Sequence, residues 1–131
     1  MLNAARAVPM IPISDRRRAI DFYAGTLSLR LYEETGGDVL FEAGEGSLLG
    51  IYETDHAGTA GHTLAGFFVE DIDAVVAGLR DRGVTFEEYD LPGLKTVDGV
   101  AQLEGERAAW FTDPDGNILA LGERSASGTA D

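Results

Sequence analysis

An internal repeat constrains the fold of this sequence more than any other feature. Residues 8–15 (VPMIPISD) match residues 64–71 (LAGFFVED), and in both copies an apolar run ends in an aspartate that begins a helix. Residues 46–51 match residues 116–121, at an offset of 70 instead of 56, so the second copy carries 14 extra residues between its helix and its last strand. Two units of about 55 to 65 residues are small for independent folding, so we expect them to share a core.

The segment after each aspartate has the spacing of a helix. Apolar side chains recur at i, i+3, i+4 and i+7, which places them on one face. They are Ile20, Tyr23, Ala24 and Leu27 in the first copy and Ile72, Val75, Val76 and Leu79 in the second. The spacing predicts one helix from Asp15 to about Leu27, and a second from Asp71 that ends at Gly83.

Short apolar runs bounded by turn residues predict the strands. They cover residues 7–13, 29–33, 39–43 and 48–53 in the first copy and 63–69, 85–89, 107–112 and 117–122 in the second. Residues 91–105 are predicted to be a long loop that contains glycines, and residues 125–131 a frayed tail.

These elements predict an α+β fold of two tandem βαβββ modules that form one curved mixed sheet, an open cup with the helices on its outer face. We expect a single domain over residues 1–131. Its parts are module one at about 7–53, a linker at 54–61, module two at about 62–123 and a flexible tail at 124–131.

The composition argues against several classes of function. The chain has 10 Lys and Arg against 23 Asp and Glu, a net charge of −13 that repels a phosphate backbone, so we expect no nucleic-acid partner. No apolar run approaches the roughly 18 residues of a membrane span, and no signal peptide is visible, so we expect a cytoplasmic protein without membrane contact. The absence of cysteine excludes disulfides, thiolate nucleophiles and cysteine-based zinc sites. The sequence also contains no serine-hydrolase, Walker or Rossmann motif.

Two motifs suggest a family. The DPDGN turn at residues 113–117 precedes the last strand, and AIDFY at residues 19–23 lies in the first helix. With the paired modules, they resemble the vicinal-oxygen-chelate superfamily over residues 7–123. This superfamily includes glyoxalase I, extradiol dioxygenases, fosfomycin-modifying enzymes and bleomycin-resistance proteins. The resemblance implies the cup and, in the enzymes, a divalent metal held there by His, Gln or Glu from the first and last strands of the modules.

The positions that match those metal ligands carry no donor atoms. They are Val8, Gly50, Leu64 and Ala120. Divalent ions need several nitrogen or oxygen donors, so we expect no metal at this position and no cofactor. The alternative is a displaced metal site near the linker, formed by Glu53, Asp55, His56 and His62.

If the positions that match the family's metal ligands face inward, as the resemblance implies, period-two alternation assigns the other side chains that line the cup. We expect the ligand contacts to be Met10, Tyr52, His62, Phe68, Trp110 and Thr112. This apolar and aromatic lining suits a ligand with planar or hydrophobic parts, and the negative charge suits a cationic one. The alternative is that Phe68 and Leu64 fill the cup themselves.

Three functions are compatible with these features. The first is a metal-free protein that binds or sequesters a small hydrophobic or aromatic molecule, similar to the bleomycin-resistance proteins, whose resemblance implies a homodimer. The second is a lyase, isomerase or dioxygenase-like enzyme with a displaced metal or none. The third is a module that binds only protein partners. We assign no catalytic residue.

Overall fold

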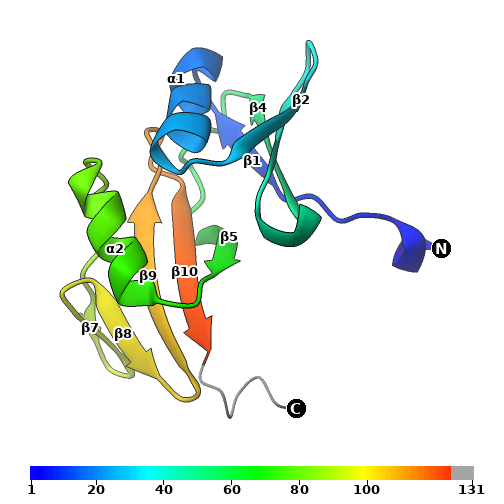
Figure 1. The fold of residues 1–131 in the computed structure, drawn as a ribbon. Coiled ribbons are helices and arrows are strands. Elements are labelled where there is room, and N and C mark those ends of the chain that lie inside the picture. Colours follow the sequence, from blue (N-terminus) through cyan, green and yellow to red (C-terminus); the bar gives the residue numbers. More distant parts are fainter. Residues whose placement is uncertain (125–131) are drawn as a thin grey trace. The chain divides into compact units, whose positions relative to one another are not determined.

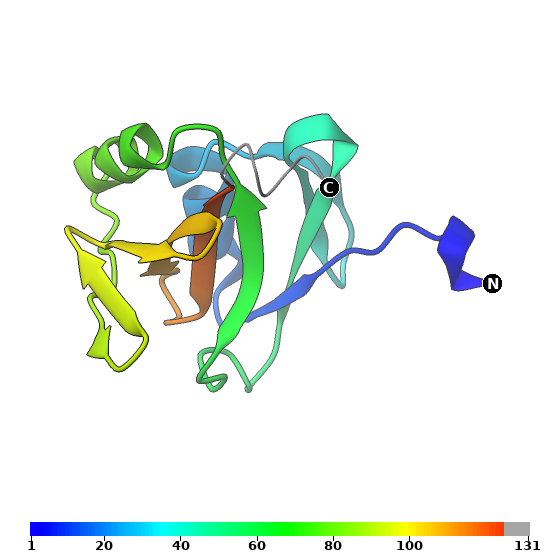
Figure 2. The ribbon, with the colours of Figure 1, turned by 90° about the horizontal axis from the view of Figure 1, so that it is seen from below.

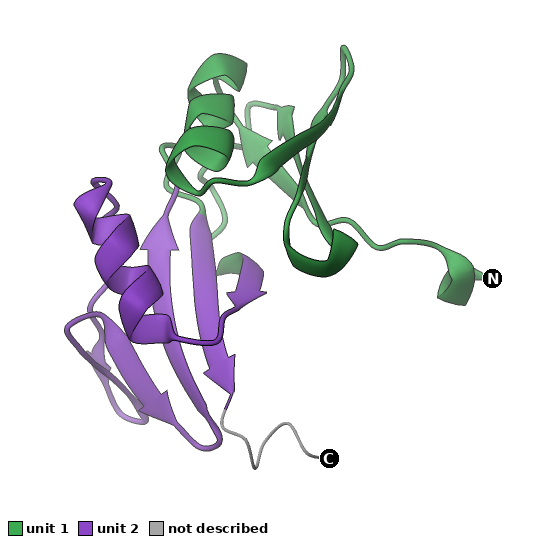
Figure 3. Cartoon of the chain, in the orientation of Figure 1, with its two compact units in different colours: residues 1–64, 114–117 green, residues 65–113, 118–131 purple. Residues whose placement is uncertain are grey.

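The computed structural model describes residues 1–124, which form two compact units (Figure 3). Unit 1 comprises residues 1–64 and 114–117, and unit 2 comprises residues 65–113 and the described chain from residue 118 onward. The predicted frayed tail at 125–131 lies outside the described residues. Arg124, which we placed in the tail, instead ends the last strand.

Unit 1 has the predicted order of one strand, one helix and three strands (Figure 1). Its elements are the short helix η1 (Leu2–Ala4), β1 (Met10–Ile13), α1 (Arg16–Ile20), the π-helical continuation η2 (Asp21–Thr26), β2 (Arg30–Glu34), β3 (Val39–Glu42), η3 (Gly44–Gly46) and β4 (Leu48–Glu53). The strand order is β1-β4-β3-β2, with β1 parallel to β4 and the other pairs antiparallel, so the sheet is mixed. The first nine residues project away from β1 (Figure 2).

The helix covers one face of this sheet. Asp15 caps it by accepting a hydrogen bond from the backbone N–H of Arg18 at 3.0 Å, as predicted. Tyr23 is fully buried and stacks on Phe41 of β3, with 5.8 Å between ring centroids. Alternate residues of β1 and β3 are buried beneath the helix, so the opposite face of these strands carries their more exposed side chains.

The DPDGN turn lies within module two of the sequence, yet residues 114–117 belong to unit 1. Asn117, fully buried, donates from Nδ2 to the carbonyl oxygen of Pro12 at 2.7 Å and accepts at Oδ1 from the N–H of Gly58 at 3.2 Å. Asp115 accepts from Arg18 Nη2 at 2.9 Å. Gly58 has φ +73°, and a Cβ there would lie 2.1 Å from the carbonyl oxygen of Asp115, so only glycine fits.

Unit 2 repeats the start of unit 1. Its elements are β5 (Thr63–Phe68), α2 (Ile72–Asp81), β6 (Asp90–Leu91), β7 (Leu94–Val97), β8 (Val100–Leu103), β9 (Glu106–Thr112) and β10 (Ile118–Arg124). The strand order is β5-β10-β9-β8-β7-β6. Asp71 caps α2 by accepting from the N–H of Ala74 at 3.1 Å, as Asp15 does for α1. Buried Ile72 and Val76 face β9 and β10, on which α2 packs.

Two predictions for unit 2 are wrong. Residues 85–89 form no strand, because only Phe86 pairs, in an isolated bridge with Phe111. Residues 91–105 are not a loop, because they contain β7 and β8. The turn between these strands, Asp98–Gly99, has φ of 53° and 82°, the two positive values of a type I′ hairpin. Because β8 pairs with β9 as β2 pairs with β3, the additional strands of unit 2 are β6 and β7, which extend its sheet.

The fold class is as predicted: α+β, with a repeated strand–helix–strand module and mixed sheets. In the described part of the chain, every helix is too short or too polar to cross a bilayer.

Candidate functional site

The face of the unit 2 sheet opposite α2 carries three of the predicted site residues. In β9 and β10, the side chains of Phe111 and Leu119 are buried on the α2 side. Alternation therefore places Trp110 and Thr112 on the other face, where both are half-buried. Trp110 lies directly opposite Ala120 in the β9–β10 ladder, and Thr112 opposite Ile118. We call this surface the sheet face of unit 2.

Phe68 of β5 is the most exposed aromatic side chain on this face. It is 73% exposed, and its ring approaches Gly122 of β10, where a Cβ would lie 3.3 Å from Cδ1. The guanidinium of Arg124 lies over the ring, 4.3 Å from the centroid. Phe68 therefore does not fill a cavity within its own unit. One face of its ring is in contact with a planar cationic group, the guanidinium of Arg124.

Trp110 is positioned by a second aromatic ring that the sequence analysis did not identify. Tyr89 meets it edge to face, with 5.4 Å between ring centroids. Burial, together with the negative charge of Glu87, raises the pKa of Tyr89, so its phenol stays protonated and is a hydrogen-bond donor near neutral pH. The segment of Tyr89 lacks strand pairing, so the alternation of a strand could not have predicted this contact.

Unit 1 has its own apolar face opposite its helix, and two predicted site residues lie on it. Met10 is 40% exposed and Tyr52 is 38% exposed. Met10 lies opposite Gly50 in the parallel β1–β4 ladder, and Tyr52 lies opposite Pro12. The two side chains are therefore diagonal neighbours on one surface.

His62 is an isolated member of the predicted set. It precedes β5, is exposed, and its Nδ1 lies 3.2 Å from the carbonyl oxygen of Thr63. Within the described residues, this is the one hydrogen bond of its side chain.

The positions expected to hold the family's metal do not fit a metal ion. In unit 1, a Cβ added to Gly50 would lie 2.5 Å from the sulfur of Met10 and 2.9 Å from Leu40 Cδ2, so apolar side chains occupy the space where a ligand would project. In unit 2, the matching residue Ala120 offers only a methyl group. Neither position supplies a donor atom.

The displaced metal site near the linker does not assemble either. Among residues 1–124, no three His, Asp or Glu side chains are grouped closely enough to hold an ion. Glu53 Oε2 accepts instead from the N–H of Arg16 at 3.2 Å, at the start of α1.

The comparisons with known proteins identify the family. The model of the Glyoxalase/Bleomycin resistance protein/Dioxygenase superfamily matches residues 6–121. The chain therefore belongs to this superfamily, which confirms the resemblance found in the sequence. A search of curated proteins gave no match.

Solved structures share the fold over almost the whole chain. A glyoxalase/bleomycin resistance protein from Catenulispora acidiphila DSM 44928 is 28% identical, with a TM-score of 0.64 over 92% of this chain and 98% of that one. A superfamily member from Sphaerobacter thermophilus DSM 20745 is 26% identical, with a TM-score of 0.70 over 95% and 100%. TnmS3, an antibiotic binding protein from Streptomyces sp. CB03234, is 24% identical, with a TM-score of 0.70 over 95% and 99%.

Proposed function

We propose that this protein binds and sequesters a small planar aromatic molecule, preferably a cation, on the sheet face of unit 2 without a metal ion. The observation that carries the proposal is the exposed ring of Phe68, on which the guanidinium of Arg124 lies. An aromatic cation can replace this guanidinium and stack on the same ring. Trp110 and Thr112 add a second aromatic surface and a hydroxyl on the same face.

Charge and family support a cationic ligand. The net charge of −13 raises the local concentration of cations around the molecule. The similar structure TnmS3 is described as an antibiotic binding protein, and the family includes bleomycin resistance proteins. Met10, Tyr52 and His62 remain predicted ligand contacts within this proposal.

The proposal includes a homodimer, which the family resemblance implies, and a cytoplasmic location, which is a separate expectation from the sequence. A dimer of chains of 13.9 kDa is distinguished from a monomer by light scattering coupled to gel filtration. Cell fractionation tests the location.

The test uses the fact that Trp110 is the single tryptophan of the chain, so its fluorescence reports on this face alone. The probe is 9-aminoacridine, a planar cation at neutral pH, and acridine is the matched neutral compound. We expect saturable quenching of Trp110, tighter for 9-aminoacridine, and unchanged by EDTA. Phe68→Ala should weaken binding roughly tenfold, or about 1.4 kcal/mol.

Leu2→Ala is the matched control, because it removes another exposed apolar side chain, in unit 1 and therefore outside this face. We expect it to leave the affinity unchanged. The proposal is overturned if quenching is not saturable, or if Phe68→Ala binds as tightly as the unchanged protein. Binding that requires a divalent metal would favour the enzyme alternative.

A further inference from the structure

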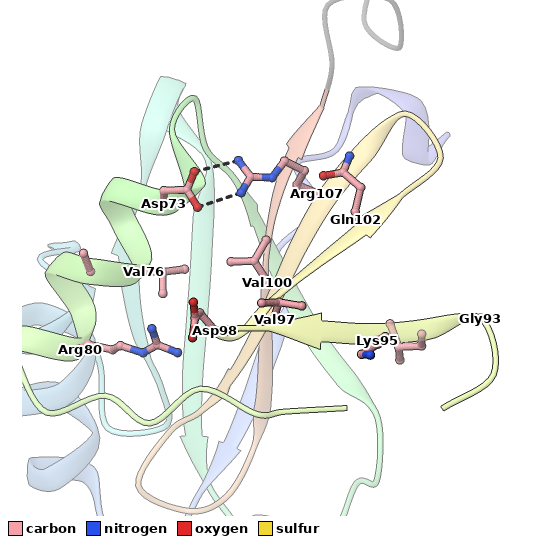
Figure 4. A pocket seen from close by; sticks show the side chains of 12 residues that line it. Asp73, Val76, Arg80, Gly93, Lys95, Val97, Asp98, Val100, Gln102 and Arg107 are labelled. Atoms are coloured by element: carbon pink, nitrogen blue, oxygen red, sulfur yellow. Dashed lines mark hydrogen bonds and ion pairs between the residues drawn. The ribbon is translucent and has the colours of Figure 1, made fainter. Parts of the chain in front are cut away.

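Unit 2 contains a groove of about 810 Å³ on the other side of the sheet from Phe68 and Trp110 (Figure 4). One wall is the face of α2 that carries Asp73, Val76 and Arg80 at helical spacing. The other wall is the β7–β8 hairpin, of which β7 has no counterpart in unit 1. The groove is large enough for a small organic molecule.

The groove is apolar in the middle and polar at its ends. Figure 4 shows Val76, Val97 and Val100 between the Asp73–Arg107 pair at one end and Arg80 at the other. Asp73 and Arg80 are seven residues apart on α2, which corresponds to about 10 Å along the helix axis. A ligand that fits this space has an apolar body and a polar end.

The two ends differ in their unused hydrogen-bonding capacity. Arg107 donates to both carboxylate oxygens of Asp73, at 2.8 and 2.9 Å, and is 3.5 Å from Glu123, so its charge is already matched by two carboxylates at this end. Arg80 lies 4.0 Å from Glu88 and over the ring of Phe86, but donates no hydrogen bond within the described residues. Its side chain is 42% exposed.

Lys95 adds a second available cation. It is the only lysine of the chain, lines the groove from β7, and makes no hydrogen bond or ion pair within residues 1–124. Two cationic groups with unused donors thus line one groove of a protein with a net charge of −13. Two carboxylates of the described chain line the groove. Asp73 is paired with Arg107, whereas Asp98, at the hairpin turn, has no hydrogen bond or ion pair among the described residues, so its charge weakens the binding of an anion.

We propose that this groove is a second binding site, which takes a small organic carboxylate with an aromatic or aliphatic body. The carboxylate accepts hydrogen bonds from Lys95, and the body lies on Val97 and Val100. Arg80 adds positive charge on the other side of Val97 (Figure 4). This site takes the opposite charge from the one proposed for the sheet face, and it does not depend on that proposal.

The probe is 2-naphthoate, with the neutral 2-naphthalenemethanol as its matched compound, titrated into uniformly ¹⁵N-labelled full-length protein. We expect amide shifts at Ala77, Val97 and Gly99, and weaker binding of the alcohol. Lys95→Gln should weaken 2-naphthoate binding about tenfold. Asp98→Asn should strengthen it about twofold, because it removes the opposing charge.

Arg6→Gln is the control, since it removes the same charge from an exposed position of unit 1. We expect it to change the affinity less than twofold. The proposal is overturned if Lys95→Gln binds 2-naphthoate as the unchanged protein does, if Asp98→Asn weakens binding, or if the shifts are confined to Phe68 and Trp110. Failure of 9-aminoacridine to bind would leave these results unchanged, so the two proposals fail separately.

Discussion

The two modules differ at the strand position where the family's metal ligand is expected. In unit 1, the space next to Gly50 is occupied by the thioether of Met10. In unit 2, the matching Ala120 lies opposite Trp110, and a Cβ on neighbouring Gly66 would lie 3.7 Å from its carbonyl oxygen, an ordinary contact. At this position, side chains therefore fill the space in unit 1, whereas unit 2 has a surface of small and aromatic residues.

This difference extends to the outer strands of the modules. Unit 1 has a helix that continues as a π-helix, whereas unit 2 has an unbroken α2 and two added strands, β6 and β7. The candidate binding features of unit 2, Phe68 on one side of the sheet and Lys95 on the other, have no counterpart in unit 1. Both proposed sites therefore lie mainly on the second module, while unit 1 contributes the predicted contacts Met10 and Tyr52.

The largest expected effect is the loss of stability when a buried ring is removed from the core of either unit. Phe111→Ala in unit 2 and Phe41→Ala in unit 1 each remove a fully buried ring that packs on another ring. Each should lower the free energy of unfolding by about 3–5 kcal/mol, because a cavity remains. Chemical denaturation measures both. A cost below about 1 kcal/mol for either would show that its unit is not packed as described.

The next effect concerns the DPDGN turn. Asn117→Ala removes the partners of the Pro12 carbonyl and the Gly58 N–H. Leaving these groups without partners should cost about 2–3 kcal/mol. Thermal unfolding measures the loss, with exposed Asn3→Ala as the control. Equal stability of the two variants would contradict the role of this turn in unit 1.

The DPDGN turn and the two helices were predictable, because their signals are local. Aspartate before a 3.6-residue apolar period specifies a capped helix, and Asp15 and Asp71 both accept the expected hydrogen bond. The β7–β8 hairpin also had a local signal, the Asp98–Gly99 pair between apolar residues, which we read as part of a loop. Phe111 was expected beneath a helix, and it is buried; the alternation of β9 then places Trp110 on the opposite face.

The groove and the Tyr89–Trp110 contact could not be predicted in this way. The groove depends on how α2 is placed against a hairpin about 20 residues further along the chain. Tyr89 is held outside a strand, by hydrogen bonds between its backbone and Thr96 at 2.8 and 2.9 Å. Such contacts follow from tertiary packing and have no period in the sequence.

A smaller difference in stability is expected between alanine substitutions at two strand glycines, Gly50 in unit 1 and Gly66 in unit 2. Gly50→Ala should cost about 1 kcal/mol, because Met10 and Leu40 must move. Gly66→Ala should be neutral or slightly stabilising, since its added methyl group meets only ordinary contacts. Urea denaturation of both variants decides this. A reversed order would show that the face of unit 1 is the more open one.

The smallest expected effect is a change in the pKa of Asp73 in unit 2. Hydrogen bonds from Arg107, together with its charge, hold the pKa of Asp73 below its ordinary value, although desolvation opposes them. The pair therefore stabilises the fold fully at a pH above about 4, the pKa of the carboxyl in the unfolded chain. This contribution is lost as the pH falls through the lowered pKa of Asp73 in the folded protein. In Arg107→Gln, NMR titration of the side-chain carboxyl carbon should show the pKa of Asp73 rising. An unchanged pKa would contradict the pairing.

Native mass spectrometry with 9-aminoacridine, on protein purified without chelator or affinity-tag metal, tests the central claim most directly. The account predicts an adduct of one 9-aminoacridine per chain and no stoichiometric divalent metal, since Val8, Gly50, Leu64 and Ala120 offer no donor atoms. Phe68→Ala should lose most of the adduct at the same probe concentration. One divalent metal ion per chain, or an adduct that Phe68→Ala retains in full, would contradict a metal-free aromatic site on unit 2.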